Sequence, residues 1–381
     1  MPQSVQSSPR VRIGINGFGR IGRAAFRASL EREDLEVVAI NHTAPSLRYF
    51  LHSCLYDSTH GRCKFAANLR IDEESQSLFF EDRKIKLFSE RDPLKLQWNG
   101  AGAEYIIEAT GKMLTVEAAS QHIKSGARKV VISAPSKDAK TIVVGVNRKE
   151  YKPDMQVISN ASCTTNCLAP LAKVLHQAFG IESALLTTIH ASTSSQHILD
   201  GYNKKSVRLG RASGTNIIPT TTGANKAISL VLPELAGRFT GISVRVPVQN
   251  VSLVDLSVVL SRPVPSKEAL LQPLRDAAAG KLKSSIGPLS NVIAVNDDEL
   301  VSSDFNGWQQ SCIVDSEATV MLNERTFKII AAYDNECGYS VRLLDLIVYM
   351  YTMDRGMQSP PDRSLPPVDA VSLNAAVEAA L

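Results

Sequence analysis

The chain has 381 residues, of which 44% are hydrophobic and 21% charged, and its formal net charge is +4. These values are typical of a soluble globular protein with a sizeable core, and the length favours two domains. The small net charge argues against nucleic acid as the main partner, and no apolar run reaches the roughly 18 residues of a membrane span. The opening MPQSVQSSPR lacks the apolar core of a secretory signal, and six scattered cysteines favour a reducing compartment, so we expect a cytoplasmic protein.

The N-terminal half predicts a parallel α/β domain. VRIGING from Val11 reads as a buried strand, RIGRAAFRASLERE from Arg20 as a helix, and LEVVAIN from Leu35 as a second strand. Parallel strands need such a helical crossover. The later runs AEYIIEAT, ARKVVISAP, KTIVVGVN and MQVISNAS predict further strands of an open, doubly wound Rossmann sheet. Ligands of such sheets bind beyond the carboxyl ends of the strands.

The first strand-to-helix turn carries the pattern G-x-G-x-x-G at Gly17, Gly19 and Gly22. Between a strand and a helix this pattern indicates dinucleotide binding, because the first glycine permits the turn, the second admits a pyrophosphate and the third allows close packing. The alternative is an ordinary tight turn. After the second strand an acidic residue would hold the adenosine ribose, but here Asn41-His42 stands instead.

The pattern of apolar residues changes near Ser162, where we expect the second domain to begin. TTNCLAPLAKVLHQAFG predicts an amphipathic helix, and the runs SALLTTIH, GISVRVPVQNVSLVDLSVVL, QSCIVDSEATVML and TFKIIAAYDN alternate with period two. They predict an α+β domain with a mixed or antiparallel sheet. We therefore expect a Rossmann domain over 1–162 and a catalytic domain over 163–330. Residues 331–381 would hold a helix that returns to the first domain and a Pro- and Ala-rich tail.

The segment SNASCTTNC contains two cysteines with different expected roles. Cys163 precedes the predicted helix, where the helix dipole and free N–H groups would lower the thiol pKa and make a nucleophile. Cys167 falls on the apolar face of that helix and reads as a packing thiol. Zinc is not expected, because no second Cys/His pair has ligand spacing. A nucleophilic cysteine needs a base, and His190, at the end of a predicted strand, is either that base or a structural histidine.

Eight segments together resemble the phosphorylating glyceraldehyde-3-phosphate dehydrogenases: NGFGRIGR, YDSTHG, ISAPSKDA, SNASCTTNCLAPLAKV, NIIPTTTGANKAI, VRVPVQNVSLVDL, VSSDF and YDNECGYS. The resemblance implies that Cys163 attacks the aldehyde of glyceraldehyde 3-phosphate and forms a thiohemiacetal. Oxidation by NAD gives a thioester, which inorganic phosphate converts to 1,3-bisphosphoglycerate. His190 would then act as base and later as acid, which requires a pKa near working pH.

The resemblance also implies the remaining site residues. The substrate phosphate and the attacking phosphate would be held by Ser162, Thr164, Thr193, Arg211, Thr222, Gly223 and Arg245. The dinucleotide would be held by Gly17, Gly19, Arg20, Ile21, His42, Arg91, Thr110, Ser133 and Asn335. The long segment from His190 to Asn216 resembles the family's loop that reaches a neighbouring subunit, which implies a homotetramer.

The chain differs from the usual sequence of the family at several positions. Family members commonly have Asp at the position of His42, Trp at Ala332 and Cys337, and Pro at Tyr202. Loss of the carboxylate at position 42 predicts that NADP is accepted beside NAD. A protonated His42 would attract the 2′-phosphate, so we expect NADP use to rise as the pH falls toward 6. Three alternatives remain open: a paralogue acting on a related aldehyde such as erythrose 4-phosphate, a second copy that tolerates electrophilic inhibitors, and an RNA-binding protein that uses the same groove.

Overall fold

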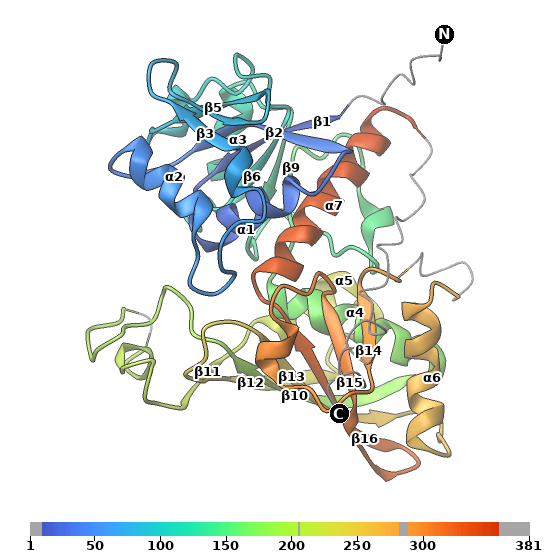
Figure 1. Ribbon diagram of the computed structural model, residues 1–381. Helices are drawn as coiled ribbons and strands as arrows, with labels where there is room; N and C mark the ends of the chain where they lie inside the picture. The colour runs from blue at the N-terminus through green and yellow to red at the C-terminus, as the bar shows by residue number, and fades with distance from the viewer. Residues whose placement is uncertain (1–9, 205, 282–288, 358–381) are drawn as a thin grey trace, which may run out of the picture.

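The computed structural model describes residues 10–204, 206–281 and 289–357. The Pro- and Ala-rich tail expected from about residue 358 lies outside the described residues. In the described part, two sheets form two lobes, one above the other in Figure 1. No helix in these ranges combines the length and apolar character that crossing a membrane requires.

The upper lobe contains a nine-stranded sheet in the order β3-β4-β5-β2-β1-β6-β7-β9-β8. All neighbours from β5 to β8 pair in parallel, while β3, β4 and β5 form an antiparallel edge. The strands are β1 (Val11–Asn16), β2 (Leu35–Asn41), β3 (Leu69–Asp72), β4 (Ser77–Phe80), β5 (Arg83–Phe88), β6 (Tyr105–Glu108), β7 (Lys129–Ile132), β8 (Lys140–Thr141) and β9 (Val157–Ser159). The helices are α1 (Arg20–Ser29), α2 (Leu47–Leu55) and α3 (Val116–Lys124).

This sheet confirms the doubly wound fold, with one local difference. KTIVVGVN forms a strand only at Lys140–Thr141. Ile142, Val143 and Val144 are buried but lead into a turn, where Asn147 accepts a hydrogen bond from Val143 N at 2.8 Å. An apolar run shows burial, and it does not by itself distinguish a strand from a buried turn.

The lower lobe contains a seven-stranded mixed sheet in the order β11-β12-β10-β13-β16-β15-β14. Its strands are β10 (Ile181–His190), β11 (Ile218–Thr221), β12 (Phe239–Arg245), β13 (Ser252–Leu260), β14 (Ile293–Asn296), β15 (Cys312–Asn323) and β16 (Thr326–Tyr333). Helices α4 (Cys163–Phe179), α5 (Ala224–Val231) and α6 (Lys267–Ala278) pack against it. The expected mixed sheet is confirmed, and β16 continues past residue 330 to Tyr333.

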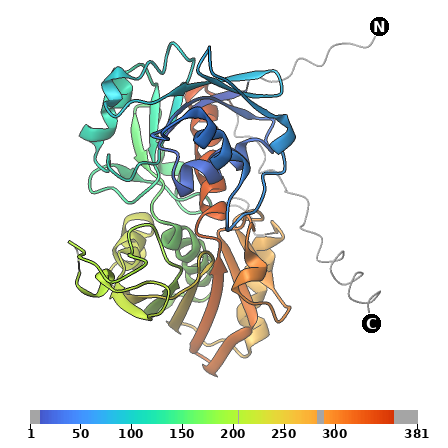
Figure 2. The same cartoon turned by 60° about the vertical axis from the view of Figure 1, so that its left-hand side comes forward.

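Helix α7 (Cys337–Asp354) connects the lobes. It follows β16 of the lower sheet and packs against α1 and β1 of the upper lobe, as Figure 1 shows. Most of its residues are buried, and the apolar core runs from β1 through α7 to the lower sheet as one cluster. Figure 2 shows the two lobes in a second view, with the segment between β10 and β11 projecting from the lower lobe.

Candidate active site

The turn between β1 and α1 has the geometry that its glycines predict. Gly17 has a φ of +95°, which favours glycine, and a Cβ there would lie 2.9 Å from the Thr110 nitrogen. A Cβ on Gly22 would lie 2.0 Å from the carbonyl oxygen of Gly17. A Cβ on Gly19 would meet nothing within 4 Å, so the space beside this residue is open. The first-turn N–H groups of α1, including those of Arg20 and Ile21, lack intrahelical acceptors and face this turn.

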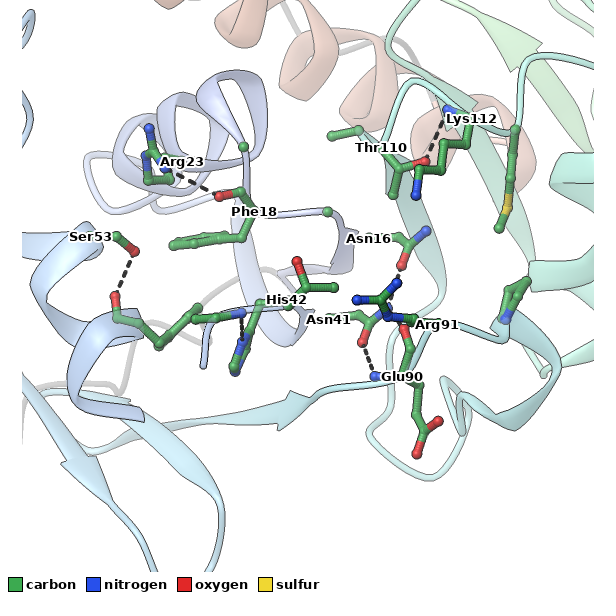
Figure 3. A pocket seen from close by; sticks show the side chains of 18 of the residues that line it. Asn16, Phe18, Arg23, Asn41, His42, Ser53, Glu90, Arg91, Thr110 and Lys112 are labelled. Atoms are coloured by element: carbon green, nitrogen blue, oxygen red, sulfur yellow. Dashed lines mark hydrogen bonds between the residues drawn. The ribbon is translucent and has the colours of Figure 1, made fainter. Parts of the chain in front are cut away.

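A cavity of about 540 Å³ lies beside the turn and beyond the ends of β1, β2 and β6. Its lining includes Gly17, Gly19, His42, Arg91 and Thr110 from the expected cofactor set, and Figure 3 shows several of these side chains. The open turn, the free N–H groups and the volume fit a dinucleotide, whose pyrophosphate would lie at the start of α1. Sequence reasoning missed other wall residues, notably Asn16, Asn41 and Lys112.

Asn16 and Asn41 order the ends of the strands behind the cavity. Asn41 Nδ2 donates to Asn16 Oδ1 at 2.7 Å and to the Glu90 carbonyl at 2.8 Å. Asn16 Nδ2 in turn donates to the buried carboxylate of Glu108 at 2.6 Å, and the Thr110 N–H donates to the same carboxylate at 2.8 Å. Polar residues at the ends of two neighbouring parallel strands are the sequence signal that could have revealed this network.

Arg20 lies at the turn, but carboxylates bind its guanidinium group. Arg20 Nε donates to Glu336 at 2.7 Å, and the other nitrogens bind Asp57 and Glu336. These ion pairs raise the pKa of Arg20, against the effect of burial. Arg20 can therefore contribute its backbone N–H to a pyrophosphate, while its side-chain charge is already neutralised. Ser133 is also held locally, because its hydroxyl donates to the Glu108 carbonyl at 2.9 Å.

His42 is almost fully buried in the wall of this cavity, with 5% of its surface exposed. Its ring stacks on Phe50 at a centroid distance of 4.4 Å, and its Nδ1 accepts the Ala44 N–H at 3.1 Å. Burial lowers the pKa of His42, so the imidazole is neutral at physiological pH. The electrostatic attraction expected between a protonated His42 and a 2′-phosphate is therefore not supported.

Cys163 is the first residue of α4. The helix begins there because the Ser162 hydroxyl caps it, accepting the Thr165 N–H at 3.1 Å. Thr164 is held by a 2.8 Å hydrogen bond between its hydroxyl and that of Tyr333. Cys167, one turn later, is fully buried within the core, as predicted for a packing thiol.

The structure brings His190 to Cys163 from the end of strand β10. The Nε2 atom of His190 lies 3.6 Å from Cys163 Sγ. On the other side of the ring, Nδ1 lies 2.7 Å from the Ala191 carbonyl oxygen. When Nδ1 carries the proton and donates it to that carbonyl, the lone pair of Nε2 is directed at the sulfur. This tautomer requires that Arg245 Nη1, 2.6 Å from Nδ1, donates to the Ala191 carbonyl and not to Nδ1. The imidazole can then accept the thiol proton, which is the geometry that general-base catalysis requires.

Arg245 lies beside this pair because β12 runs parallel to β10 with His190 opposite Arg245. Its Nη1 is 2.6 Å from His190 Nδ1 and donates to the Ala191 carbonyl at 3.0 Å. Burial and the charge of Arg245 lower the pKa of His190 to about 4, not to the expected value near working pH. Burial also raises the pKa of the Cys163 thiol, and the Thr164 N–H and Arg245 only partly offset it. The expected lowering of that pKa by the helix start is thus outweighed by desolvation.

The other expected phosphate ligands form two groups. Thr222 and Gly223 lie between β11 and α5, where the Thr222 hydroxyl accepts the Ala224 N–H at 3.2 Å. Thr193 and Arg211 lie on the segment between β10 and β11. Arg211 forms an exposed ion pair with Asp200 at 2.7 Å, and among the described residues no contact joins it to Cys163. Asn335 is linked to the centre through Ser252, whose hydroxyl donates to Asn335 at 2.9 Å and accepts the Ala191 N–H at 3.0 Å.

A Rossmann turn beside a dinucleotide-sized cavity, together with a cysteine–histidine pair on a second domain, defines a nicotinamide-dependent oxidoreductase with a thiol nucleophile. The family profiles "Glyceraldehyde 3-phosphate dehydrogenase, NAD binding domain" and "Glyceraldehyde 3-phosphate dehydrogenase, C-terminal domain" match residues 11–116 and 162–335. The chain belongs to the glyceraldehyde-3-phosphate dehydrogenase family, and its cofactor is NAD.

Curated relatives match nearly the whole chain. A glyceraldehyde-3-phosphate dehydrogenase of Glossina morsitans morsitans is 48% identical over 90% of this chain and 99% of its own length. The cytosolic enzyme of Dianthus caryophyllus is 45% identical over 90% of this chain and 98% of its own. A chloroplastic enzyme of Arabidopsis thaliana is 47% identical over 91% of this chain and 80% of its own.

Proposed function

We propose that this protein oxidises D-glyceraldehyde 3-phosphate and phosphorylates the product to 1,3-bisphosphoglycerate. The observation that carries the proposal is the 3.6 Å approach of His190 Nε2 to Cys163 Sγ, at the start of a helix and beside Arg245. The relatives' names support this activity over the paralogous-aldehyde and RNA-binding alternatives.

In the proposed reaction, His190 Nε2 takes the Cys163 proton as the sulfur attacks the aldehyde carbon, and a C–S bond forms. The imidazolium then returns that proton to the carbonyl oxygen, which gives a thiohemiacetal with a hydroxyl group and a neutral His190. The same nitrogen then accepts the proton of the thiohemiacetal hydroxyl as the carbon is oxidised to a thioester. NAD, when bound, supplies the hydride acceptor for this oxidation. A phosphate oxygen attacks the thioester carbon, the C–S bond breaks, and Cys163 leaves as a thiolate that takes back the proton held on His190 Nε2.

The raised pKa of the Cys163 thiol and the lowered pKa of His190 favour the neutral pair, with the proton on sulfur. Proton transfer would therefore accompany attack on the substrate. Arg245 lowers the pKa of His190, and we propose that it also acts on the substrate. It lies beside both groups, so its charge can stabilise the developing oxyanion or the substrate phosphate, with Ser162 and Thr164 as neighbouring hydroxyl donors.

We further propose that the protein is a homotetramer. It would act in the cytoplasm, on glyceraldehyde 3-phosphate and inorganic phosphate. Large apolar side chains are exposed on the segment between β10 and β11 and on the outer face of the lower sheet: Ile198, Leu199, Tyr202, Val207, Ile217, Leu185 and Ile242. Apolar exposure of this extent is typical of a buried interface between subunits. Light scattering should give about four times the chain mass at micromolar concentration, and an active monomer would contradict the assembly.

Steady-state kinetics with glyceraldehyde 3-phosphate test the activity. Reduction of NAD should require the aldehyde and should increase with inorganic phosphate. Erythrose 4-phosphate under the same conditions serves as the comparison substrate, and a higher kcat/KM for it would overturn the substrate assignment. NADP in place of NAD measures the cofactor preference.

A further inference from the structure

A second cavity, of about 240 Å³, lies between helix α1, residues 59–65 and residues 306–309, at the start of α7. It shares no lining residue with the dinucleotide cavity. Two thiols, Cys63 and Cys337, form part of its wall, and we call it the Cys63–Cys337 pocket. The small Cys337 side chain, whose thiol donates to the Gly307 carbonyl at 3.4 Å, leaves this space open.

The wall combines apolar surface with positive charge. Ala24, Ala28 and Phe65 supply apolar surface beside the two thiols. Three cations line it: Arg27, Arg62 and Lys64. The one carboxylate in the lining, Glu31, is already paired with Lys64 at 3.0 Å. Arg27 donates to the Cys54 and Gly61 carbonyls, neither of which neutralises its charge. The pocket therefore favours an anion with an apolar body.

The thiols themselves offer little reactivity. Burial raises the pKa of Cys337 to about 12, and the nearby charges of Asp334 and Glu31 add to the effect while that of Lys64 opposes it. Cys63 is 6% exposed. A thiol of such high pKa is a poor nucleophile, so the ligand chemistry here is reversible binding and not covalent capture. The volume lies below the range of about 300–1,000 Å³ typical of drug-sized ligands, which limits the ligand to a small molecule.

A charged network joins this pocket to the dinucleotide turn. His60 lines the pocket, and its Nε2 lies 2.9 Å from Glu336, the residue before Cys337. Glu336 binds Arg20, the first residue of α1, at 2.7 Å. His60 N–H also donates to Asp57 at 3.0 Å, and Asp57 binds the same arginine. A shift of His60 therefore changes the groups that hold the start of α1, where the pyrophosphate would bind.

We propose that the Cys63–Cys337 pocket binds a small aromatic carboxylate and that its occupancy changes the affinity for the dinucleotide. The site goes beyond the proposed dehydrogenase activity, and only its coupling rests on dinucleotide binding. By linkage, the dinucleotide changes the affinity for the carboxylate by the same factor.

Indole-3-acetate is a suitable probe, with 3-methylindole as the same ring without the carboxylate. Isothermal titration of the full-length protein should show saturable binding of indole-3-acetate and at least about tenfold weaker binding of 3-methylindole, since a charge-assisted contact contributes about 1.5 kcal/mol or more. Cys337→Trp fills the pocket and should abolish binding, whereas Cys337→Ala keeps it open and should retain binding. Ala28→Met narrows the opposite wall and replaces the Trp variant if that variant fails to fold.

The coupling is measured by titrating NAD with and without saturating indole-3-acetate. The expected change in the Kd for NAD is about fivefold or more in the wild type. His60→Gln should still bind the probe but lose the change. Absence of probe binding to the wild type, or equal binding to Cys337→Trp, would overturn the site, and an unchanged Kd for NAD would overturn the coupling. Dehydrogenase activity without the probe is a separate measurement, so these failures leave the proposed function intact.

Discussion

The two halves of the active site are constructed differently. The dinucleotide turn is one continuous segment from β1 to α1, and its shape is set by backbone angles and by the absence of side chains at Gly17 and Gly22. The catalytic centre combines the start of α4, the end of β10 and Arg245 on β12, and its properties are set by burial and charge. The first half therefore follows from local sequence, whereas the second depends on contacts between distant segments.

The largest expected effect tests which thiol carries the chemistry. Cys163→Ser should lower kcat by on the order of 10⁴-fold or more, as loss of a nucleophile does in other enzymes. Cys167→Ser is the matched control, one helical turn away and fully buried. It should keep most of the activity and lose about 1–3 kcal/mol of stability, because a hydroxyl is buried in apolar surroundings. Steady-state kinetics and chemical denaturation measure both, and inactivation by the Cys167 change alone would reverse the assignment.

The second prediction concerns the charge state of His190. Its pKa is about 4 in the folded protein, whereas an unfolded histidine titrates near pH 6.5. Between these values only the unfolded state binds the proton, so the free energy of unfolding increases with pH across this window. Acidification from about pH 6.5 to 4 should cost up to about 3 kcal/mol from this group.

Urea denaturation at several pH values tests this. Between pH 6.5 and pH 4 the wild type should lose up to about 3 kcal/mol of stability relative to His190→Gln, because the variant lacks the group that takes up the proton on unfolding. His52→Gln removes an exposed histidine of α2 and should follow the wild-type profile. A His190→Gln profile parallel to the wild type would show that His190 titrates normally in the folded protein.

The third prediction separates two glycines of the same turn. Gly22→Ala brings a Cβ to 2.0 Å from the Gly17 carbonyl oxygen, so the helix must move, at a cost of about 1–3 kcal/mol. In Gly19→Ala the added Cβ meets no atom within 4 Å, so the free energy of unfolding should stay within about 0.5 kcal/mol of the wild-type value. It should nevertheless bind NAD more weakly, because its Cβ enters the space left for the pyrophosphate. Unchanged NAD affinity in Gly19→Ala would reduce the turn to a purely structural feature.

The sequence predicted the elements that rest on local pattern. The Gly-rich turn, the helix capped by Ser162 and the alternating strands of the lower sheet all have signals within a few residues. It could not predict that Glu336 would bind Arg20, because these residues are 316 positions apart. The pKa of His190 depends in the same way on the register that places Arg245 beside it. Ion pairs and pKa shifts of this kind depend on contacts between distant segments, which only the folded structure shows.

The last prediction concerns position 42, where the residue type is read from the sequence but its burial and charge depend on the fold. The loss of the family's carboxylate predicts that NADP is accepted, and the buried, neutral imidazole removes any reason for NADP use to rise toward pH 6. His42→Asp should restore both a ribose acceptor and repulsion of a 2′-phosphate, and should shift the ratio of kcat/KM for NAD over NADP toward NAD by roughly tenfold. His42→Asn is the neutral control and should leave the ratio within about threefold, since it adds no charge. Kinetics with both cofactors between pH 6 and 8 decide the point. NADP use that increases on acidification in the wild type would mean that His42 gains a proton despite its stacking on Phe50. A ratio that Asp does not change would mean that the wall around Arg91 and Lys112, and not position 42, sets the choice of cofactor.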